Sequence, residues 1–163
     1  MKVSRGMAQF FIYVLKMSKM QSNKNVDLFY IEDNEDFIDF VGIALKRVDT
    51  TINYSYVTDG LKAKEILESA LPDSPYKKAK LILLDYNLPG LSGMQLLDRI
   101  RSESSLKHTP VVVFSSSDNP QDIRNAYSHG ANAYVVKPIG MANLKDTIQT
   151  VCDFWLNKNQ RCL

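Results

Sequence analysis

The sequence predicts an α/β fold in which a parallel sheet of five strands is covered by helices on both faces. Five short apolar segments alternate with five segments whose apolar residues recur at helical spacing. The central apolar segment, residues 81–84, is a continuous run, which is typical of a parallel strand buried on both faces. We therefore expect right-handed crossovers and one doubly wound sheet.

The strands are predicted from short β-prone apolar runs bounded by polar or turn residues. The third strand is the run at residues 81–84, and the others are predicted at 26–31, 52–57, 111–114 and 133–136. No internal repeat or low-complexity segment competes with this pattern.

The helices are predicted from apolar spacing and from start and stop signals. Asp59 and Ser92 are placed to cap the second and third helices, and Asn119 followed by Pro120 begins the fourth. Gly130 is the expected end of that fourth helix. The last helix is marked by apolar residues at a period of 3.6, namely Leu144, Ile148, Val151 and Trp155.

Composition limits the class of protein. A chain of 163 residues with 45% hydrophobic and 23% charged residues suits one globular domain. The net charge of +2 is spread along the chain, so no nucleic-acid or membrane surface is expected. Cys152 and Cys162 have neither metal-ligand spacing nor the density of a disulfide scaffold, so we expect a reducing cytoplasm.

Residues 1–25 are expected to form an extension to the domain. Their apolar stretch at 7–15 is too short to span a bilayer, and no small-residue cleavage site follows it. Three alternatives remain open: a helix packed on the domain, a disordered tail, or sequence upstream of a later start at Met17 or Met20.

Asp85 follows the central strand directly and precedes the turn residues Pro89 and Gly90. In open parallel sheets, ligands bind at the carboxyl ends of the strands. Asp85 is therefore a candidate site residue, and the alternative is that it only caps a turn.

Two further acids, Glu32 and Asp33, follow the first strand, and they converge with Asp85 if the first and third strands are neighbours. Three converging carboxylates repel one another unless a cation is present, and Mg²⁺ suits a site with few protein oxygens. Asp33, Asp85 and the backbone carbonyl at Asn87 are the expected direct ligands, with Glu32 acting through water. The segment Glu32–Asp33–Asn34 can also cap the first helix, and both roles are compatible.

Ser115 follows the fourth strand and Lys137 follows the fifth, so both belong to the same sheet edge. A hydroxyl and an ammonium beside a metal-bound carboxylate form an anion site that suits a phosphoryl group transferred to Asp85. The Lys137–Pro138 bond can be cis, which would fix the direction of the lysine. The alternative for Lys137 is an ordinary surface lysine.

Together these residues resemble the receiver domain of bacterial two-component response regulators. The acidic pair Glu32–Asp33, Asp85 with Asn87 two residues later, Ser115 and the Lys137–Pro138 pair stand in the family's order and spacing. The resemblance implies a flavodoxin-like (βα)5 fold with strand order 2-1-3-4-5. The resemblance implies a receiver domain at residues 26–157, and residues 158–163 are then a C-terminal tail.

The resemblance implies a phosphoacceptor protein in a phosphorelay, which catalyses only its own phosphorylation and dephosphorylation. Asp85 would take a phosphoryl group from a sensor histidine kinase or a phosphotransfer protein, with Mg²⁺ held by Asp33, Asp85 and Asn87. Ser115 and Lys137 would hold the phosphoryl oxygens. Ser115 and the aromatic Tyr134 would act as switch residues, although a half-buried strand tyrosine is the alternative for Tyr134.

The resemblance also implies partners. The loop at residues 72–80 and the sequence at 153–156 look like those of regulators that partner bacterial phytochromes. A stand-alone regulator would signal through protein contact. A homodimer through the fourth helix, fifth strand and fifth helix is one such contact, and Trp155 belongs either to it or to the core.

Two residues depart from the family pattern, and three other functions are alternatives. Glu32 stands where many receivers have Asp, and Ser116 stands where many have Ala. A haloacid-dehalogenase-like phosphatase would need a second Asp where Asn87 stands, and a flavin carrier would need a phosphate loop where Glu32 and Asp33 stand. A phosphorylation-independent interaction module is the remaining alternative.

Overall fold

The computed structural model describes residues 25–68, 74–76 and 78–160 of the chain. Most of the predicted extension at 1–25, and the end of the tail predicted at 158–163, lie outside these residues. Residues 72, 73 and 77 of the loop predicted at 72–80 also lie outside them. The domain boundaries therefore stay predictions.

The sheet has the predicted architecture. Its strands are β1 (Leu28–Ile31), β2 (Tyr54–Val57), β3 (Leu81–Leu84), β4 (Val111–Ser115) and β5 (Ala133–Val136). They are all parallel and lie in the order β2-β1-β3-β4-β5. The predicted fold class and strand order are confirmed, and β1 and β3, which carry the acids, are neighbours.

The first two strands begin two residues later than the apolar pattern predicts. The Asp27 carboxylate accepts a hydrogen bond from the Asn53 backbone N–H at 3.0 Å and pairs with the Lys80 ammonium at 2.8 Å. These side-chain contacts hold the start of the sheet together ahead of the regular ladder.

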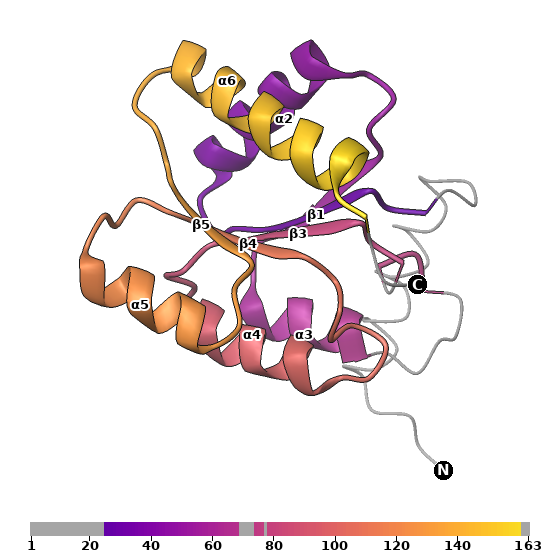
Figure 1. Cartoon of the computed structure of the whole chain (residues 1–163), viewed down its shortest axis with the longest axis vertical. Helices are drawn as coiled ribbons and strands as arrows, with labels where there is room; N and C mark the ends of the chain where they lie inside the picture. Colours follow the sequence, from indigo (N-terminus) through magenta and orange to yellow (C-terminus); the bar gives the residue numbers. More distant parts are fainter. Residues whose placement is uncertain (1–24, 69–73, 77, 161–163) are drawn as a thin grey trace.

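Helices cover both faces of the sheet, with α2 and α6 on one face and α3, α4 and α5 on the other (Figure 1). Their bounds are α2 (Glu35–Val48), α3 (Gly60–Glu68), α4 (Gly93–Ser102), α5 (Pro120–Ser128) and α6 (Met141–Cys152). A π-helical segment, η1 (Asp153–Lys158), continues α6.

The predicted helix signals are present. The side chains of Ser92 and Asn119 accept from backbone N–H groups in the first turns of α4 and α5. The Asp59 carboxylate accepts from the Lys62 N–H at 2.9 Å, at the start of α3. Gly130, with φ of 91°, follows the end of α5 in the left-handed conformation that suits glycine.

The core has one layer on each face of the sheet. Alternate residues of β1 point to opposite faces, so Phe29 and Ile31 pack towards α3, α4 and α5, whereas Leu28 and Tyr30 pack towards α2 and α6. Trp155 of η1 is partly buried against the α2–α6 layer. This burial favours the core role among the two considered for Trp155.

The fold places the carboxyl ends of β1, β3, β4 and β5 at one edge of the sheet. Glu32, Asp33, Asp85 and Lys137 follow strands there, whereas Ser115 is the last residue of β4 and Tyr134 lies within β5. In the described part of the chain, no helix combines the length and apolar character needed to cross a membrane.

Candidate functional site

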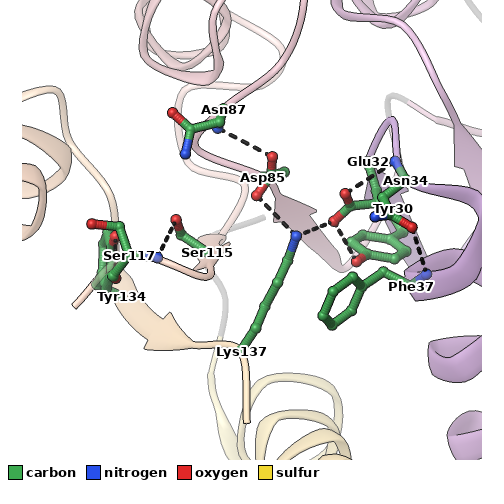
Figure 2. Close-up of polar contacts among 10 residues, drawn as sticks. All are labelled: Tyr30, Glu32, Asn34, Phe37, Asp85, Asn87, Ser115, Ser117, Tyr134 and Lys137. Atoms are coloured by element: carbon green, nitrogen blue, oxygen red, sulfur yellow. Dashed lines mark hydrogen bonds and ion pairs between the residues drawn. The ribbon is translucent and has the colours of Figure 1, made fainter. Parts of the chain in front are cut away.

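Asp85 lies at the exit of β3 with its carboxylate nearly enclosed. The residue is 4% exposed, and its backbone N–H donates to the Ile31 carbonyl at 2.9 Å, which ties it to β1. Its Oδ2 accepts from the Asn87 N–H at 3.1 Å (Figure 2). Asp85 therefore does cap its own turn, but the turn leaves Oδ1 directed towards other site residues.

Gly93, at the start of α4, permits this close packing. A Cβ at position 93 would lie 2.2 Å from the Asp85 carbonyl oxygen and 3.0 Å from that of Tyr86. Backbone atoms cannot give way as a flexible side chain can, so α4 approaches the strand exit because residue 93 is glycine.

The two acids after β1 occupy different environments. Glu32 is 1% exposed, whereas Asp33 is exposed. Burial raises the pKa of the Glu32 carboxyl, and hydrogen bonds from Lys137 and Tyr30 oppose that rise. Its Oε1 accepts from the Asn34 N–H at 3.2 Å, and the Asn34 side chain caps α2. The expected capping role of this segment thus falls mainly to Asn34.

Lys137 links the acids of β1 and β3. Its Nζ lies 2.6 Å from Glu32 Oε2 and 3.1 Å from Asp85 Oδ1, with its side chain only 4% exposed (Figure 2). It is not the surface lysine considered as an alternative.

The expectation of a cis bond between Lys137 and Pro138 is wrong, because the described residues contain no cis peptide bond. The direction of the lysine comes instead from its backbone and its charge. The Lys137 N–H donates to the Ser115 carbonyl at 2.7 Å, and the ammonium pairs with two carboxylates.

An aromatic ring covers the ammonium on a third side. The Lys137 Nζ lies 4.5 Å from the centroid of the Phe37 ring, at the start of α2. A cation over a ring face at this distance is attracted by the ring quadrupole. The ammonium therefore contacts two carboxylates and the Phe37 ring, and the centroid of a second ring, that of Phe114, lies 6.0 Å away.

Ser115 and Tyr134 lie on the α5 side of the site. Ser115 is fully buried at the end of β4, and its hydroxyl accepts from the Ser117 N–H at 3.2 Å. The Tyr134 hydroxyl donates to the Ser117 carbonyl at 2.9 Å, and its ring lies 6.5 Å from that of Tyr86. Tyr134 therefore touches the loop after Ser115 and the residue after Asp85, without contacting the acids themselves.

The site opens into a cavity of about 510 Å³ lined by Asp33, Asn87 and Asn125, among others. One oxygen from each of Glu32, Asp33 and Asp85 lies within 4.8 Å of the others. Three carboxylates facing one ammonium leave two negative charges uncompensated when all are ionised. Hard oxygen donors with this charge fit Mg²⁺.

Buried polar and charged residues are concentrated at this edge of the sheet. Six polar or charged residues are buried in the described part of the chain, and four of them belong to this site: Glu32, Asp85, Ser115 and Lys137. Burying such groups costs free energy unless they are paired, so their concentration at one edge is typical of a functional site.

Sequence reasoning missed Tyr30, Phe37 and Gly93. Tyr30 and Glu32 are two residues apart on one strand, so their side chains share a face, and this spacing was a usable signal. In the sequence, Phe37 falls at helical spacing among other apolar residues, and Gly93 follows the predicted cap Ser92. Neither pattern shows that the Phe37 ring faces the Lys137 ammonium, or that residue 93 packs against the backbone of Asp85.

Comparison with known proteins identifies the family. Residues 28–149 match the model of the response regulator receiver domain. Response regulator Rcp1 of Synechocystis is 31% identical over 138 residues, which cover 83% of this chain and 92% of Rcp1.

Solved structures agree. The phosphorylated cyanobacterial phytochrome response regulator RcpA has a TM-score of 0.76 and 31% identity, and the match covers 85% of this chain and 99% of RcpA. The Mn²⁺-bound form of Rcp1 has a TM-score of 0.71 and 29% identity, covering 83% and 98%. The chain therefore belongs to the receiver domains of two-component response regulators, which bind Mg²⁺ at an acidic pocket and serve as phosphoacceptors for histidine kinases or phosphotransfer proteins.

Proposed function

We propose that this chain is a response regulator that accepts a phosphoryl group on Asp85 from a sensor histidine kinase. The observation that carries the proposal is the enclosed Asp85 carboxylate, which is paired with Lys137 and lies within 4.8 Å of two other acids. The Asp85 carboxylate has the Lys137 ammonium on one side and an open cavity nearby. This arrangement suits the binding of an anionic group at Asp85.

Asp33, Asp85 and the backbone carbonyl of Asn87 would hold Mg²⁺, with Glu32 acting through water. The mutual distance of the three carboxylates supports this set, as does the Mn²⁺-bound form of the related Rcp1. When bound, the ion supplies positive charge that offsets the charge on the phosphoryl oxygens.

In the transfer, a bond forms between an Asp85 oxygen and phosphorus while the bond from phosphorus to the donor histidine nitrogen breaks. The phosphoryl group adds roughly one to two negative charges. Lys137 and Ser115 are the residues of this chain that would hold its oxygens. The position of Lys137 supports this role, because its Nζ lies 3.1 Å from Asp85 Oδ1.

Ser115 and Tyr134 form the proposed switch. Both residues are joined to Ser117, Ser115 through its hydroxyl and Tyr134 through its own hydroxyl. A displacement of Ser115 towards a phosphoryl group would therefore alter the acceptor that holds Tyr134. Through these hydrogen bonds, phosphorylation of Asp85 would change the surface formed by α5, β5 and α6.

That surface carries exposed apolar side chains suited to a protein contact. Tyr127 is 50% exposed, Val136 is 41% exposed and Ile139 is 92% exposed. A homodimer through α5, β5 and α6 is the contact we propose, and a phytochrome-type kinase is the proposed phosphodonor because the related RcpA is a phytochrome response regulator.

Turnover as a phosphatase is not favoured. Asn87 stands where a haloacid-dehalogenase-like enzyme needs its acid, and a carboxamide side chain has no acidic proton to give to a leaving group.

Intact-mass measurement after incubation with acetyl phosphate tests the proposal. The native chain should gain one phosphoryl group in the presence of Mg²⁺ and none after removal of divalent ions with a chelator. Asp85→Asn should gain none under either condition. A folded native chain without an adduct would favour a phosphorylation-independent interaction module.

A further inference from the structure

Tyr30 is a buried tyrosine whose hydroxyl reaches the acidic site from inside the core. The residue lies in β1, has no exposed surface, and packs its ring 6.4 Å from that of Phe114. Its hydroxyl donates to Glu32 Oε2 at 2.7 Å (Figure 2). A phenylalanine would fill the same space without having to satisfy a buried hydroxyl.

The oxygen that accepts from Tyr30 is also the one that holds the lysine. Glu32 Oε2 lies 2.7 Å from the Tyr30 hydroxyl and 2.6 Å from Lys137 Nζ. The other oxygen, Oε1, accepts from the Asn34 N–H. Glu32 is thus fixed by contacts at both oxygens, and its position is set from the core side by Tyr30.

The position of Glu32 in turn sets that of the Lys137 ammonium. The contact of the ammonium with Glu32 Oε2 is the shortest of four, the others being Asp85 Oδ1 at 3.1 Å and the ring centroids of Phe37 at 4.5 Å and Phe114 at 6.0 Å. A shift of Glu32 would move the ammonium relative to Asp85. Transfer reactions that depend on positioning are sensitive to such shifts.

We propose that Tyr30 is a positioning residue for phosphoryl transfer, which acts through Glu32 to hold the Lys137 ammonium against Asp85. The inference rests on the proposed function of Asp85. It also assigns a reason for the glutamate at position 32, because its extra methylene, compared with aspartate, lets one carboxylate oxygen meet both the tyrosine and the lysine.

The first test compares Tyr30→Phe with a matched control, Tyr76→Phe. Tyr76 is a partly buried tyrosine that packs on Phe29 of β1, and its hydroxyl faces Ser55 in the other core layer. With acetyl phosphate at saturating Mg²⁺, Tyr30→Phe should be phosphorylated about five- to tenfold more slowly than the native chain. Tyr76→Phe should stay within twofold.

The dependence of the rate on Mg²⁺ concentration separates positioning of the lysine from an effect on the metal. The apparent Mg²⁺ constant of Tyr30→Phe should stay within twofold of the native value, because the proposed ligands are Asp33, Asp85 and Asn87. A native rate in Tyr30→Phe, or a slower rate explained wholly by weaker Mg²⁺ binding, would overturn the inference.

A double-mutant cycle tests whether Tyr30 acts through Glu32. Glu32→Asp shortens the side chain away from the Tyr30 hydroxyl, so it should slow the reaction by a similar factor. Adding Tyr30→Phe to Glu32→Asp should then change the rate by less than about 1.5-fold. An equal loss from Tyr30→Phe in both backgrounds, or a native rate in Glu32→Asp, would refute action through Glu32. If Tyr30→Phe does not fold, Tyr30→Leu, which also removes the hydroxyl, takes its place in the cycle and is judged by the same outcomes.

A metal-free readout completes the test. The ¹⁵N-labelled ammonium signal of Lys137, assigned with Lys137→Arg, should shift or broaden in Tyr30→Phe and stay in place in Tyr76→Phe. An unmoved signal would overturn the inference. If the native chain itself takes no phosphoryl group, the proposed function fails. If the native chain is phosphorylated and the variants match it, only the role of Tyr30 fails.

Discussion

Burial lowers the reactivity of an ionisable side chain, and Cys152 is the example in this chain. Cys152 lies in the layer between the sheet and α2 and α6, and is 1% exposed. Burial, with smaller contributions from Asp153 and Asp49, raises the pKa of its thiol to about 12. The neutral thiol is therefore the form that the folded chain favours.

We predict that Cys152 resists alkylation in the folded chain. Raising the pKa from 9.0 to about 12 lowers the thiolate fraction at pH 8 by about a thousandfold. Peptide mass spectrometry after iodoacetamide treatment should find Cys152 unmodified in buffer and modified in guanidinium. Rapid modification in buffer would show that the thiol is not buried as described.

The same shift predicts how stability depends on pH. A group with a raised folded pKa stabilises the fold below its ordinary pKa of 9.0, and this contribution is lost as the pH rises towards about 12. Cys152→Ala removes this dependence. Unfolding by urea at pH 8 and at pH 10.5 should therefore show a smaller pH-dependent loss of stability in Cys152→Ala than in the native chain.

At the element scale, the turn between β3 and α4 determines where Asp85 is presented. The helix cap at Ser92 and the missing side chain at Gly93 contribute to this turn in different ways. The cap satisfies backbone N–H groups of α4, whereas Gly93 sets the distance between α4 and the backbone of Asp85.

Gly93→Ala should damage both stability and function. The added methyl group would meet the Asp85 carbonyl oxygen at 2.2 Å, so the strand exit or the helix must move. We expect a loss of about 3 kcal/mol in the free energy of unfolding, and phosphorylation slowed by more than about tenfold.

Gln95→Ala is the matched control in the same turn. Gln95 is exposed, and its side chain accepts from the Ser92 N–H at 3.0 Å as part of the capping box. Its loss should cost about 1 kcal/mol or less and leave the phosphorylation rate within twofold. Equal effects of the two variants would contradict the special role of Gly93.

The elements themselves were largely predictable from sequence. β3 and β5 have the predicted bounds because their apolar runs are sharply bordered, and the caps at Ser92 and Asn119 followed from side-chain chemistry. The contacts within the site were less accessible. The repulsion argument for the three acids implied a metal ion but left out Lys137, whose ammonium balances part of that charge.

At the scale of the whole molecule, the two ends of the sheet have different roles. The carboxyl ends of the strands carry the acids and the lysine, whereas the opposite end is held by Arg101 at the end of α4. Its guanidinium donates to the carbonyls of Gly130 at 2.8 Å, Thr109 at 2.9 Å and Lys107 at 3.3 Å, and to Asn132 Oδ1 at 2.7 Å. Arg101 therefore ties together the segments that lead into β4 and β5.

Arg101→Lys should lower stability without affecting phosphorylation. An ammonium cannot reproduce the planar fork that reaches four acceptors, so we expect a loss on the order of 2 kcal/mol in the free energy of unfolding by urea. Arg99→Lys, at an exposed position of the same helix, should change stability by less than about 0.5 kcal/mol. A phosphorylation rate that fell together with stability in Arg101→Lys would contradict this division between the two ends.

In the proposed mechanism Asp85, and no other acid of the cluster, receives the phosphoryl group. Borohydride reduction of the phosphorylated chain converts the acyl phosphate of an aspartate to homoserine, which peptide sequencing by mass spectrometry can locate. If Asp85 alone is phosphorylated, homoserine should be found at position 85 and at no other position. Homoserine at position 33, or an acyl phosphate that survives in Asp85→Asn, would contradict it.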